Sequence, residues 1–381
     1  MNIKRKIIII IQKLNNNWRD YITSNKIIDF QEKSIFIKFL REKLHLIKES
    51  DNFNSQLEKN LLRSIARFSE DLVHLAHLIF EEVSPHLKTK NFNPNYFMKP
   101  YLMIHLPNDK SEEGIMHSDY EFTEDGFVTC WAPLERYDYP ALSSLGSFAQ
   151  KLSSFPKTAT LLKHFKEILI CQRADPGDVR FWSQSYLHKG NRNTSNHTSF
   201  VLVTKLSKQP LSAGSYKILN NSLNENLYKD DTINLGQINY ESMNKDFFEI
   251  AYELNEIVQN INFQKLQTLT KKTLKQFSII ELKILSFFLS VQAQRIWARP
   301  FYYEELDGLK INDGIKLWKT YDFFSISIGC ENISSVQRLI NTNYDFIPIK
   351  FIDEINKMML EKDKFNLNLW NKIYVKSKSN N

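Results

Sequence analysis

Two side chains that can bind a metal ion stand two positions apart in the segment His117-Ser118-Asp119. The segment is expected at the end of a strand within a sheet-rich part of the chain, and in an extended strand residues i and i+2 point to the same side. The imidazole of His117 and the carboxylate of Asp119 can therefore reach one metal ion from the same face. A His-x-Asp pair occurs often by chance, so the prediction depends on a third ligand from elsewhere in the chain.

His188 is the candidate for that third ligand. It follows the turn Pro176-Gly177-Asp178 and the β-rich run 179–183, which we expect to place it near the end of a strand that faces the first pair. Two His and one carboxylate, with the other coordination positions open, form the facial triad of non-haem Fe(II) oxygenases. The three residues together predict an Fe(II) site.

The same part of the chain resembles the Fe(II)/2-oxoglutarate-dependent oxygenases of the phytanoyl-CoA dioxygenase type. Within that superfamily it is most similar to oxygenases of bacterial carbohydrate-biosynthesis clusters and of aminoglycoside pathways. The resemblance covers roughly residues 90–206 and extends at most to the helices before them. It rests on residues 100–107 (PYLMIHLP), 117–122 (HSDYEF), 131–134 (WAPL), 176–178 (PGD) and 188–205.

The resemblance implies a fold, cofactors and residue roles. It implies a double-stranded β-helix, Fe(II) held by His117, Asp119 and His188, and 2-oxoglutarate and O₂ as cosubstrates. The implied substrate is a small molecule such as a sugar or a sugar conjugate. Related halogenases replace the metal-binding carboxylate with a small residue that admits chloride. The presence of Asp119 therefore favours hydroxylation, desaturation or ring chemistry.

The chain departs from these relatives at the residue that pairs with the distal carboxylate of 2-oxoglutarate. Relatives place an Arg after the last His, at positions that correspond here to 197–200, where this chain has His-Thr-Ser-Phe. A buried carboxylate without a cationic partner is costly. The candidate cosubstrate residues are therefore Arg192 and Lys99, together with His197 and Ser199 at the expected position. If none of them serves, the chain does not use 2-oxoglutarate.

The elements that must position these residues begin with helices in residues 1–90. Apolar residues from Leu57 to Ile79 recur at spacings of three and four, which predicts one face of an α-helix. Ser55 can cap this helix, and Pro85 is expected to end it. We expect the helices to pack on the domain that follows.

Residues 91–206 have a residue pattern typical of an antiparallel β-sheet protein. Short runs rich in β-branched and aromatic residues alternate with turn clusters, which predicts a double-sheet jelly roll as the oxygenase core. The predicted fold class is α+β. The predicted strands are residues 101–106, 127–134, 179–183 and 200–206.

The remainder of the chain gives less information about function. Residues 207–240 are rich in Ser, Asn and Lys and predict a linker or long loop. Residues 241–381 predict a mostly helical domain of unknown role, with helices over 247–261 and 274–297. A strand-helix-strand-helix pattern follows over 323–360.

Several other residues have both a structural and a functional interpretation. Trp131 and Trp182 lie on predicted strands and are expected either to line the pocket or to pack in the core. Arg180 is either in a surface pair or in contact with substrate. His74 and His77 stand three apart beside the apolar stripe of a helix, a spacing that can hold a metal, but they are expected to be ordinary boundary histidines. His105 alternates with apolar residues on a strand and is expected to be a core histidine.

Composition excludes several classes of protein. The net charge of +7 is spread along the chain, since residues 241–381 hold 19 basic and 17 acidic residues, so we do not expect a nucleic-acid-binding protein. Three widely spaced Cys exclude a disulfide framework and a thiolate zinc site, and they fit a reducing cytoplasm. The apolar runs are short or contain charges, so no membrane span is expected. We therefore expect a cytoplasmic protein.

A second class of function stays open beside the oxygenase. The chain could be a non-catalytic or 2-oxoglutarate-independent metal-binding jelly-roll module, with residues 241–381 as an interaction domain. The absence of an Arg at 197–200 keeps this alternative open. A basic side chain in a cavity beside the metal would favour the enzyme, and a cavity filled by aromatic side chains would favour the module. The oligomeric state is not predicted.

Overall fold

The computed structural model of the 381-residue chain divides into two compact units. Unit 1 contains residues 1–50, 71–211 and 215–224, and unit 2 contains residues 51–70, 212–214 and 225–381. The structure describes residues 20–23, 25–34, 38, 55–107, 119, 126–135, 139, 141–146, 170–172, 175–184, 186–211, 214–218, 240–302 and 320–321.

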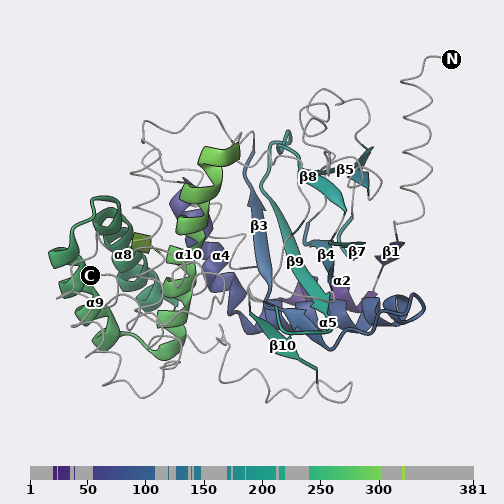
Figure 1. Ribbon diagram of the computed structural model, residues 1–381, viewed down its shortest axis with the longest axis horizontal. Helices are drawn as coiled ribbons and strands as arrows, with labels where there is room; N and C mark the ends of the chain where they lie inside the picture. The colour runs from purple at the N-terminus through teal and green to yellow at the C-terminus, as the bar shows by residue number, and fades with distance from the viewer. Residues whose placement is uncertain are drawn as a thin grey trace, which may run out of the picture. The chain divides into compact units, whose positions relative to one another are not determined.

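Unit 1 contains two antiparallel sheets (Figure 1). The large sheet has the strand order β1-β7-β4-β9-β2-β10, and β3 also pairs with β9; the small sheet has the order β6-β5-β8. The strands are β1 (Asp20–Thr23), β2 (Tyr96–Met98), β3 (Tyr101–His105), β4 (Phe127–Pro133), β5 (Leu142–Gly146), β6 (Ile170–Gln172), β7 (Asp178–Ser183), β8 (Leu187–Gly190), β9 (Ser199–Ser207) and β10 (Ser215–Lys217). The predicted α+β class and the four predicted strands are confirmed.

One face of the large sheet, which we call the inner face, packs against the small sheet. Trp131, Trp182 and Val201 from the large sheet share a buried cluster with Leu142 of β5. Residues that pair directly across antiparallel strands point to the same face. The pairing places seven residues of the central strands on the inner face: Thr129, Trp131, Arg180, Trp182, Val201, Val203 and Lys205.

Helix α5 (Glu70–Lys88) covers the opposite face of the large sheet. The His77 ring stacks on Phe97 of β2 with centroids 5.6 Å apart, and the His86 ring lies 6.5 Å from Phe181 of β7. Phe181 alternates with the inner-face residues of β7, so it points to this outer face. The prediction that Pro85 ends the helix is wrong, because Pro85 lies within the last turn of α5 and the helix continues to Lys88. Helix α2 (Asn25–Lys33) also belongs to unit 1, and Nε2 of its Gln31 donates a hydrogen bond to the carbonyl oxygen of Pro133 at 3.0 Å.

The apolar stripe that predicted one helix spans two. α4 (Ser55–Arg67) ends before α5 begins, and the 68–69 link is closed by backbone hydrogen bonds from Phe68 to Ile65 and from Ser69 to Ala66. Apolar residues keep their three- and four-residue spacing across this link, so periodicity could not reveal it. The division into units also differs from the predicted boundary at residue 90, because residues 51–70 group with the C-terminal residues.

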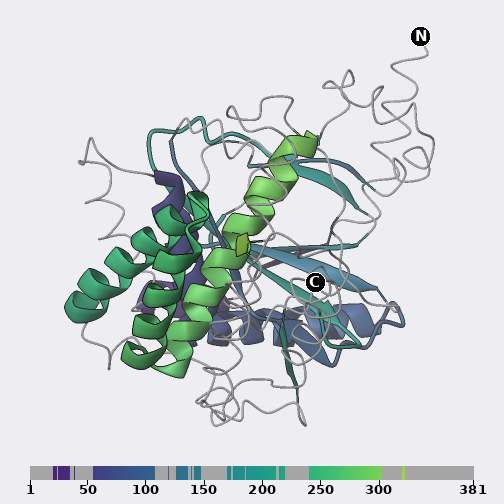
Figure 2. The same ribbon diagram turned by 60° about the vertical axis from the view of Figure 1, so that its left-hand side comes forward.

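Unit 2 is built from four described helices (Figure 2). Besides α4, these are α8 (Tyr240–Gln259), α9 (Phe263–Gln276) and α10 (Ile279–Tyr302). Asn60 of α4 hydrogen-bonds Gln292 of α10 at 2.5 Å, and Gln292 donates to Asn255 of α8 at 3.0 Å. The hydroxyl of Tyr321 donates to the same Asn255 oxygen at 2.6 Å. A partly buried chain of polar side chains thus links three helices of the unit.

In two segments of the C-terminal half, the structure differs from the predicted secondary structure. The helix predicted over 274–297 is two helices, because Ser278 and Glu281 form a reciprocal capping box at the start of α10. The predicted linker 207–240 contains β10, which pairs with β2. The predicted elements over 323–360 lie outside the described residues. Within the described part of the chain, no helix has the length and apolar character needed to cross a membrane.

Candidate metal centre

Asp119 and His188 lie next to each other, although 69 positions separate them in the sequence. Nε2 of His188 is 4.0 Å from Oδ1 of Asp119. His188 is buried on β8 of the small sheet, and Asp119 precedes β4 of the large sheet. Two of the three predicted metal ligands are therefore brought together. The third, His117, lies outside the described residues.

A backbone hydrogen bond sets which nitrogen of His188 faces Asp119. Nδ1 of His188 lies 3.0 Å from the carbonyl oxygen of Tyr186. A carbonyl only accepts, so in the neutral ring the proton is on Nδ1 and the lone pair is on Nε2. Metal-binding histidines use this arrangement, because the second hydrogen bond fixes both the tautomer and the ring orientation.

Asp119 is oriented by the large sheet. The hydroxyl of Thr129, a buried residue of β4, donates to Oδ2 of Asp119 at 2.5 Å. Oδ1, the other carboxylate oxygen, is the one that faces His188. The hydrogen bond therefore fixes the carboxylate with one oxygen directed toward the imidazole.

The donor set fits a divalent metal ion. A lone-pair nitrogen and a carboxylate oxygen face each other, and two metal–ligand bonds of about 2.1 Å each can bridge atoms up to about 4.2 Å apart. The observed 4.0 Å is below that upper limit but exceeds the about 3.0 Å between two ligands at 90°, so metal binding would draw the two side chains about 1 Å closer. Among the described residues, no group of three or more His, Cys, Asp or Glu side chains is suited to a metal, so a complete site needs a ligand such as His117 from elsewhere in the chain.

Aromatic side chains border this pair. The Trp182 ring lies 4.9 Å from the His188 ring, and Tyr186 lies 6.4 Å from it, both between centroids. Trp182 and Trp131 belong to the buried cluster between the sheets, so both pack in the core, and Trp182 also contacts the site. Nε1 of Trp182 is buried and has no hydrogen-bond partner within the part of the chain that the structure describes.

Two buried cations lie on the inner face. Arg180 is 4% exposed, and its guanidinium carbon is 5.5 Å from the centroid of the Trp131 ring. Lys205 is 8% exposed, and its Nζ is 4.6 Å from the centroid of Phe127. The surface-pair interpretation of Arg180 is therefore excluded. The burial of Lys205 was not predicted, although its alternation with Val201 and Val203 along β9 was a usable signal.

Two of the predicted cosubstrate residues, Ser199 and His197, lie at the far end of β9 from Asp119. Lys205 pairs with Thr129, which contacts Asp119, whereas Ser199 lies six residues earlier. Six residues of antiparallel strand span about 20 Å. Ser199 is buried, and its Oγ has no hydrogen-bond partner among the described residues. The carbonyl of His197 accepts from the Asn193 amide.

Arg192 and Lys99 have other surroundings. Arg192 is partly exposed in the segment between β8 and β9. Nζ of Lys99 lies 5.2 Å from the Tyr216 ring, which packs 5.4 Å from Phe97 on the side that α5 covers. Neither position is on the inner face next to Asp119. The assignment of Arg192, Lys99, His197 or Ser199 to 2-oxoglutarate stays a prediction.

The predicted structural histidines are buried as expected. His105 is at the end of β3, where its carbonyl accepts from Asn193 at 2.9 Å. His77 is buried in α5 against Phe97, and burial, aided by the nearby His74, lowers its pKa to about 4. His77 is therefore neutral at physiological pH and packs as a core side chain.

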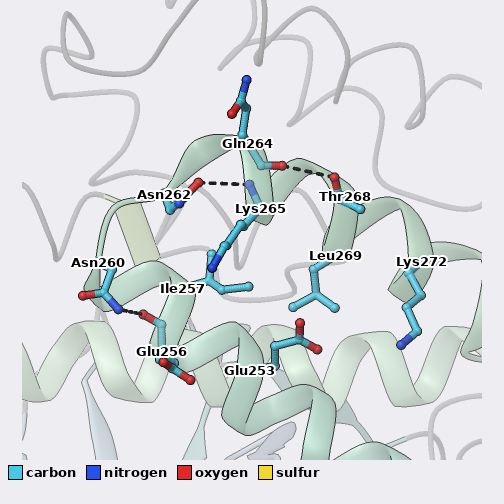
Figure 3. A pocket seen from close by; sticks show the side chains of 10 residues that line it. All are labelled: Glu253, Glu256, Ile257, Asn260, Asn262, Gln264, Lys265, Thr268, Leu269 and Lys272. Atoms are coloured by element: carbon cyan, nitrogen blue, oxygen red, sulfur yellow. Dashed lines mark hydrogen bonds between the residues drawn. The ribbon is translucent and has the colours of Figure 1, made fainter.

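An open pocket of about 840 Å³ lies between α8 and α9 of unit 2 (Figure 3). Its floor contains Ile257 and Leu269, and its rim is polar, with Glu253, Lys265 and Lys272 among the lining side chains. The rim residues are exposed. No residue of the predicted site lines this pocket.

Comparisons with known proteins give only distant similarities. No protein-family model matches the chain, and no curated protein sequence matches it. One similar solved structure is SnoK, a non-heme alpha-ketoglutarate-dependent carbocyclase from nogalamycin biosynthesis. It aligns at 12% identity with a TM-score of 0.31, and the alignment covers 48% of this chain and 84% of the SnoK chain. HygX from Streptomyces hygroscopicus, solved with nickel and 2-oxoglutarate, aligns at 9% identity over 51% and 85%, also with a TM-score of 0.31.

A third similar structure is matched over a smaller part. EvdMO1 aligns at 12% identity over 34% of this chain, with a TM-score of 0.25, and the aligned part spans only 32% of EvdMO1. All three TM-scores lie below 0.5, so these similarities establish neither a shared fold nor a shared activity.

Proposed function

We propose that the protein is a non-haem Fe(II)- and 2-oxoglutarate-dependent oxygenase that hydroxylates a small polar molecule, such as a sugar or a sugar conjugate. Its two sheets would be those of a double-stranded β-helix, and the metal ligands would be His117, Asp119 and His188. The observation that carries the proposal is the pair of ligand atoms, Nε2 of His188 and Oδ1 of Asp119, which face each other at 4.0 Å. Each is oriented by a hydrogen bond on its other side.

Each residue of the pair has a defined task in this proposal. Thr129 keeps Oδ2 of Asp119 occupied, so that Oδ1 points to the metal. The Tyr186 carbonyl holds the proton of His188 on Nδ1 and keeps Nε2 available as a ligand. When bound, Fe(II) and 2-oxoglutarate supply the oxidising power, since O₂ and 2-oxoglutarate are consumed, CO₂ and succinate are released, and one oxygen atom is added to the substrate. The buried aromatic wall around His188 limits the access of water.

We assign the distal carboxylate of 2-oxoglutarate to Arg180, in place of the candidates from sequence spacing. Arg180 is two residues from Trp182 on the same face of β7, and Trp182 contacts His188. Two residues of strand span about 6.8 Å, a distance that a five-carbon dicarboxylate bound at the metal can cover. A guanidinium offers a paired set of donors to a carboxylate, and burial strengthens that interaction.

The test is an anaerobic titration of the protein with Fe(II) and 2-oxoglutarate, read by visible absorption. The wild-type protein should develop the weak charge-transfer band of the chelate, and His117→Ala and His188→Ala should abolish it. Arg180→Met should raise the dissociation constant for 2-oxoglutarate roughly tenfold or more, because a charge-assisted hydrogen bond is lost. Arg180→Lys should recover part of the affinity.

Arg192→Met is the matched control, since it removes the same charge from the partly exposed segment after β8. It should leave the dissociation constant unchanged. If Arg192→Met weakens 2-oxoglutarate and Arg180→Met does not, the assignment of Arg180 is wrong. If the wild-type protein binds Fe(II) but gives neither the band nor succinate, the alternative of a 2-oxoglutarate-independent metal-binding module is correct.

A further inference from the structure

The indole nitrogen of Trp182 is a buried hydrogen-bond donor beside the candidate metal centre. Trp182 is 6% exposed, and its Nε1 has no hydrogen-bond partner among the described residues. An indole N–H can only donate, so its partner has to be an acceptor. A donor that is buried without an acceptor destabilises the fold, and such groups are rare in folded proteins. A ligand that supplies the acceptor would explain why the donor is kept there.

Trp182 lies next to the residues that form and orient the candidate ligand pair. Its ring centroid is 4.9 Å from that of His188 on β8. Across the large sheet it pairs directly with Thr129, the residue whose hydroxyl donates to Asp119. Side chains that pair in this way have Cβ atoms about 5 Å apart on the same face. The indole therefore borders the site on the side of both ligands.

The buried neighbours of the indole pack it without accepting a hydrogen bond from it. They are the other members of the cluster between the two sheets, namely Trp131, Tyr139, Ala141, Leu142, Tyr186 and Val201. This packing limits the rotation of the ring and keeps water away from it. An acceptor on a bound ligand would therefore meet a donor that is already oriented and already dry, which strengthens the hydrogen bond.

A carboxylate bound to the metal would bring an acceptor to this place. A metal ion stands about 2.1 Å from a histidine nitrogen, and a carboxylate oxygen stands about 2.1 Å from the metal. The two bonds together reach up to about 4.2 Å from the imidazole, a length similar to the 4.9 Å between the two rings. A hydrogen bond to an ionised oxygen is also stronger than one to a neutral acceptor.

We propose that Trp182 binds the ligand that shares the metal with Asp119 and His188, by donating its indole N–H to a carboxylate oxygen of that ligand. This inference rests on the proposed function. Under that function the carboxylate belongs to 2-oxoglutarate, and Arg180, two residues away on the same face of β7, holds the other end of the molecule. A simple carboxylate such as acetate offers the same chemistry to Trp182 without the second contact.

The contact can be read directly from the indole N–H by NMR. The full chain, with ¹⁵N in its six tryptophan side chains, is loaded with diamagnetic Zn(II) and titrated with 2-oxoglutarate or with acetate. Trp182→Phe identifies the signal of Trp182, because that signal disappears. A hydrogen bond to a carboxylate should move the Trp182 proton downfield, and the other tryptophan signals should move less. A shift with 2-oxoglutarate alone shows that the second contact is needed, and a shift with both shows that a simple carboxylate suffices.

An isosteric replacement assigns the effect to the N–H group. Replacement of Trp182 by 3-benzothienylalanine puts a sulfur atom in place of the N–H and keeps the shape of the ring. The dissociation constant for 2-oxoglutarate should rise roughly tenfold to a hundredfold, because a charge-assisted hydrogen bond is lost. The affinity for Zn(II) alone should stay the same, since Trp182 is not a metal ligand. The metal-free protein should unfold at the same or a higher urea concentration, because the replacement removes a buried donor without an acceptor.

Three results would overturn the inference. The Trp182 signal does not move with either carboxylate, or the replaced protein binds 2-oxoglutarate as tightly as the wild type. The third is a metal-free replaced protein that unfolds at a lower urea concentration, because the N–H would then have a structural partner.

Failure of the proposed function gives different results. If acetate moves the Trp182 signal of the Zn(II)-loaded wild type and 2-oxoglutarate does not bind, the contact is correct and the cosubstrate is wrong. If the wild-type protein takes up no Zn(II), the metal centre and the contact are both wrong.

Discussion

Thr129→Val is the substitution that most directly tests how Asp119 is oriented. Valine has nearly the shape of threonine, but it lacks the hydroxyl that donates to Oδ2 of Asp119 at 2.5 Å. A hydrogen bond to a charged group contributes about 1.5–3 kcal/mol. Loss of a residue that orients a metal ligand typically lowers metal affinity by about 10- to 100-fold. We therefore expect the dissociation constant for Co(II) to rise within that range.

The assay is a calorimetric titration of the purified protein with Co(II) at neutral pH. Thr129→Ser keeps a hydroxyl and should bind Co(II) within a few-fold of the wild type. Thr204→Val serves as the control, because Thr204 is equally buried on the opposite face of β9, where its hydroxyl donates to the Met98 carbonyl at 2.8 Å. That control should lower stability without changing metal affinity. Equal Co(II) affinity in Thr129→Val and the wild type would refute the role given to Thr129.

Two further predictions concern the stability of unit 1. The buried His77 has a pKa near 4, against about 6.5 when unfolded, so the unfolded chain binds a proton that the folded chain does not. The contribution of His77 to the free energy of unfolding is complete above pH 6.5 and falls by up to about 3 kcal/mol as the pH drops from 6.5 toward 4. Urea titrations at several pH values should show this fall, and His77→Leu should make the free energy of unfolding less dependent on pH. The same pH dependence in His77→Leu and the wild type would contradict the prediction. Gly177→Ala should lower the unfolding free energy by more than about 1 kcal/mol, because φ is +91° and a Cβ would lie 2.1 Å from Cγ1 of Ile28. Gly126→Ala, at φ +71° with only a flexible side chain nearby, should lose less, and equal losses would refute the steric argument.

The strands of unit 1 were predictable because their residues are β-branched or aromatic and are bounded by turns. The boundaries of the helices were harder to predict from the sequence. The link between α4 and α5 keeps the apolar spacing, and only tertiary packing reveals it. The start of α10 did have a local signal, since Ser278 and Glu281 stand at the spacing of a capping box.

The candidate site was predictable in part, for a different reason. Asp119 and His188 have residue types that suit a metal, and the fold brings them together. Two of the cosubstrate candidates, His197 and Ser199, were predicted by counting positions after the last His, and such counting carries no information on how the strands pair. Register, which depends on how the strands pair, puts Ser199 at the far end of β9. The burial of Lys205 was not predicted, because a lysine in a strand is usually exposed and its burial depends on the packing around it.

The most direct test of the central claim is an anaerobic crystal structure of the protein with Fe(II) and 2-oxoglutarate. We predict one metal ion bound by His117, Asp119 and His188, with the distal carboxylate of 2-oxoglutarate at Arg180. A metal ion bound elsewhere, or a space beside Asp119 and His188 filled by Trp182 and its aromatic neighbours with no room for a cosubstrate, would contradict it.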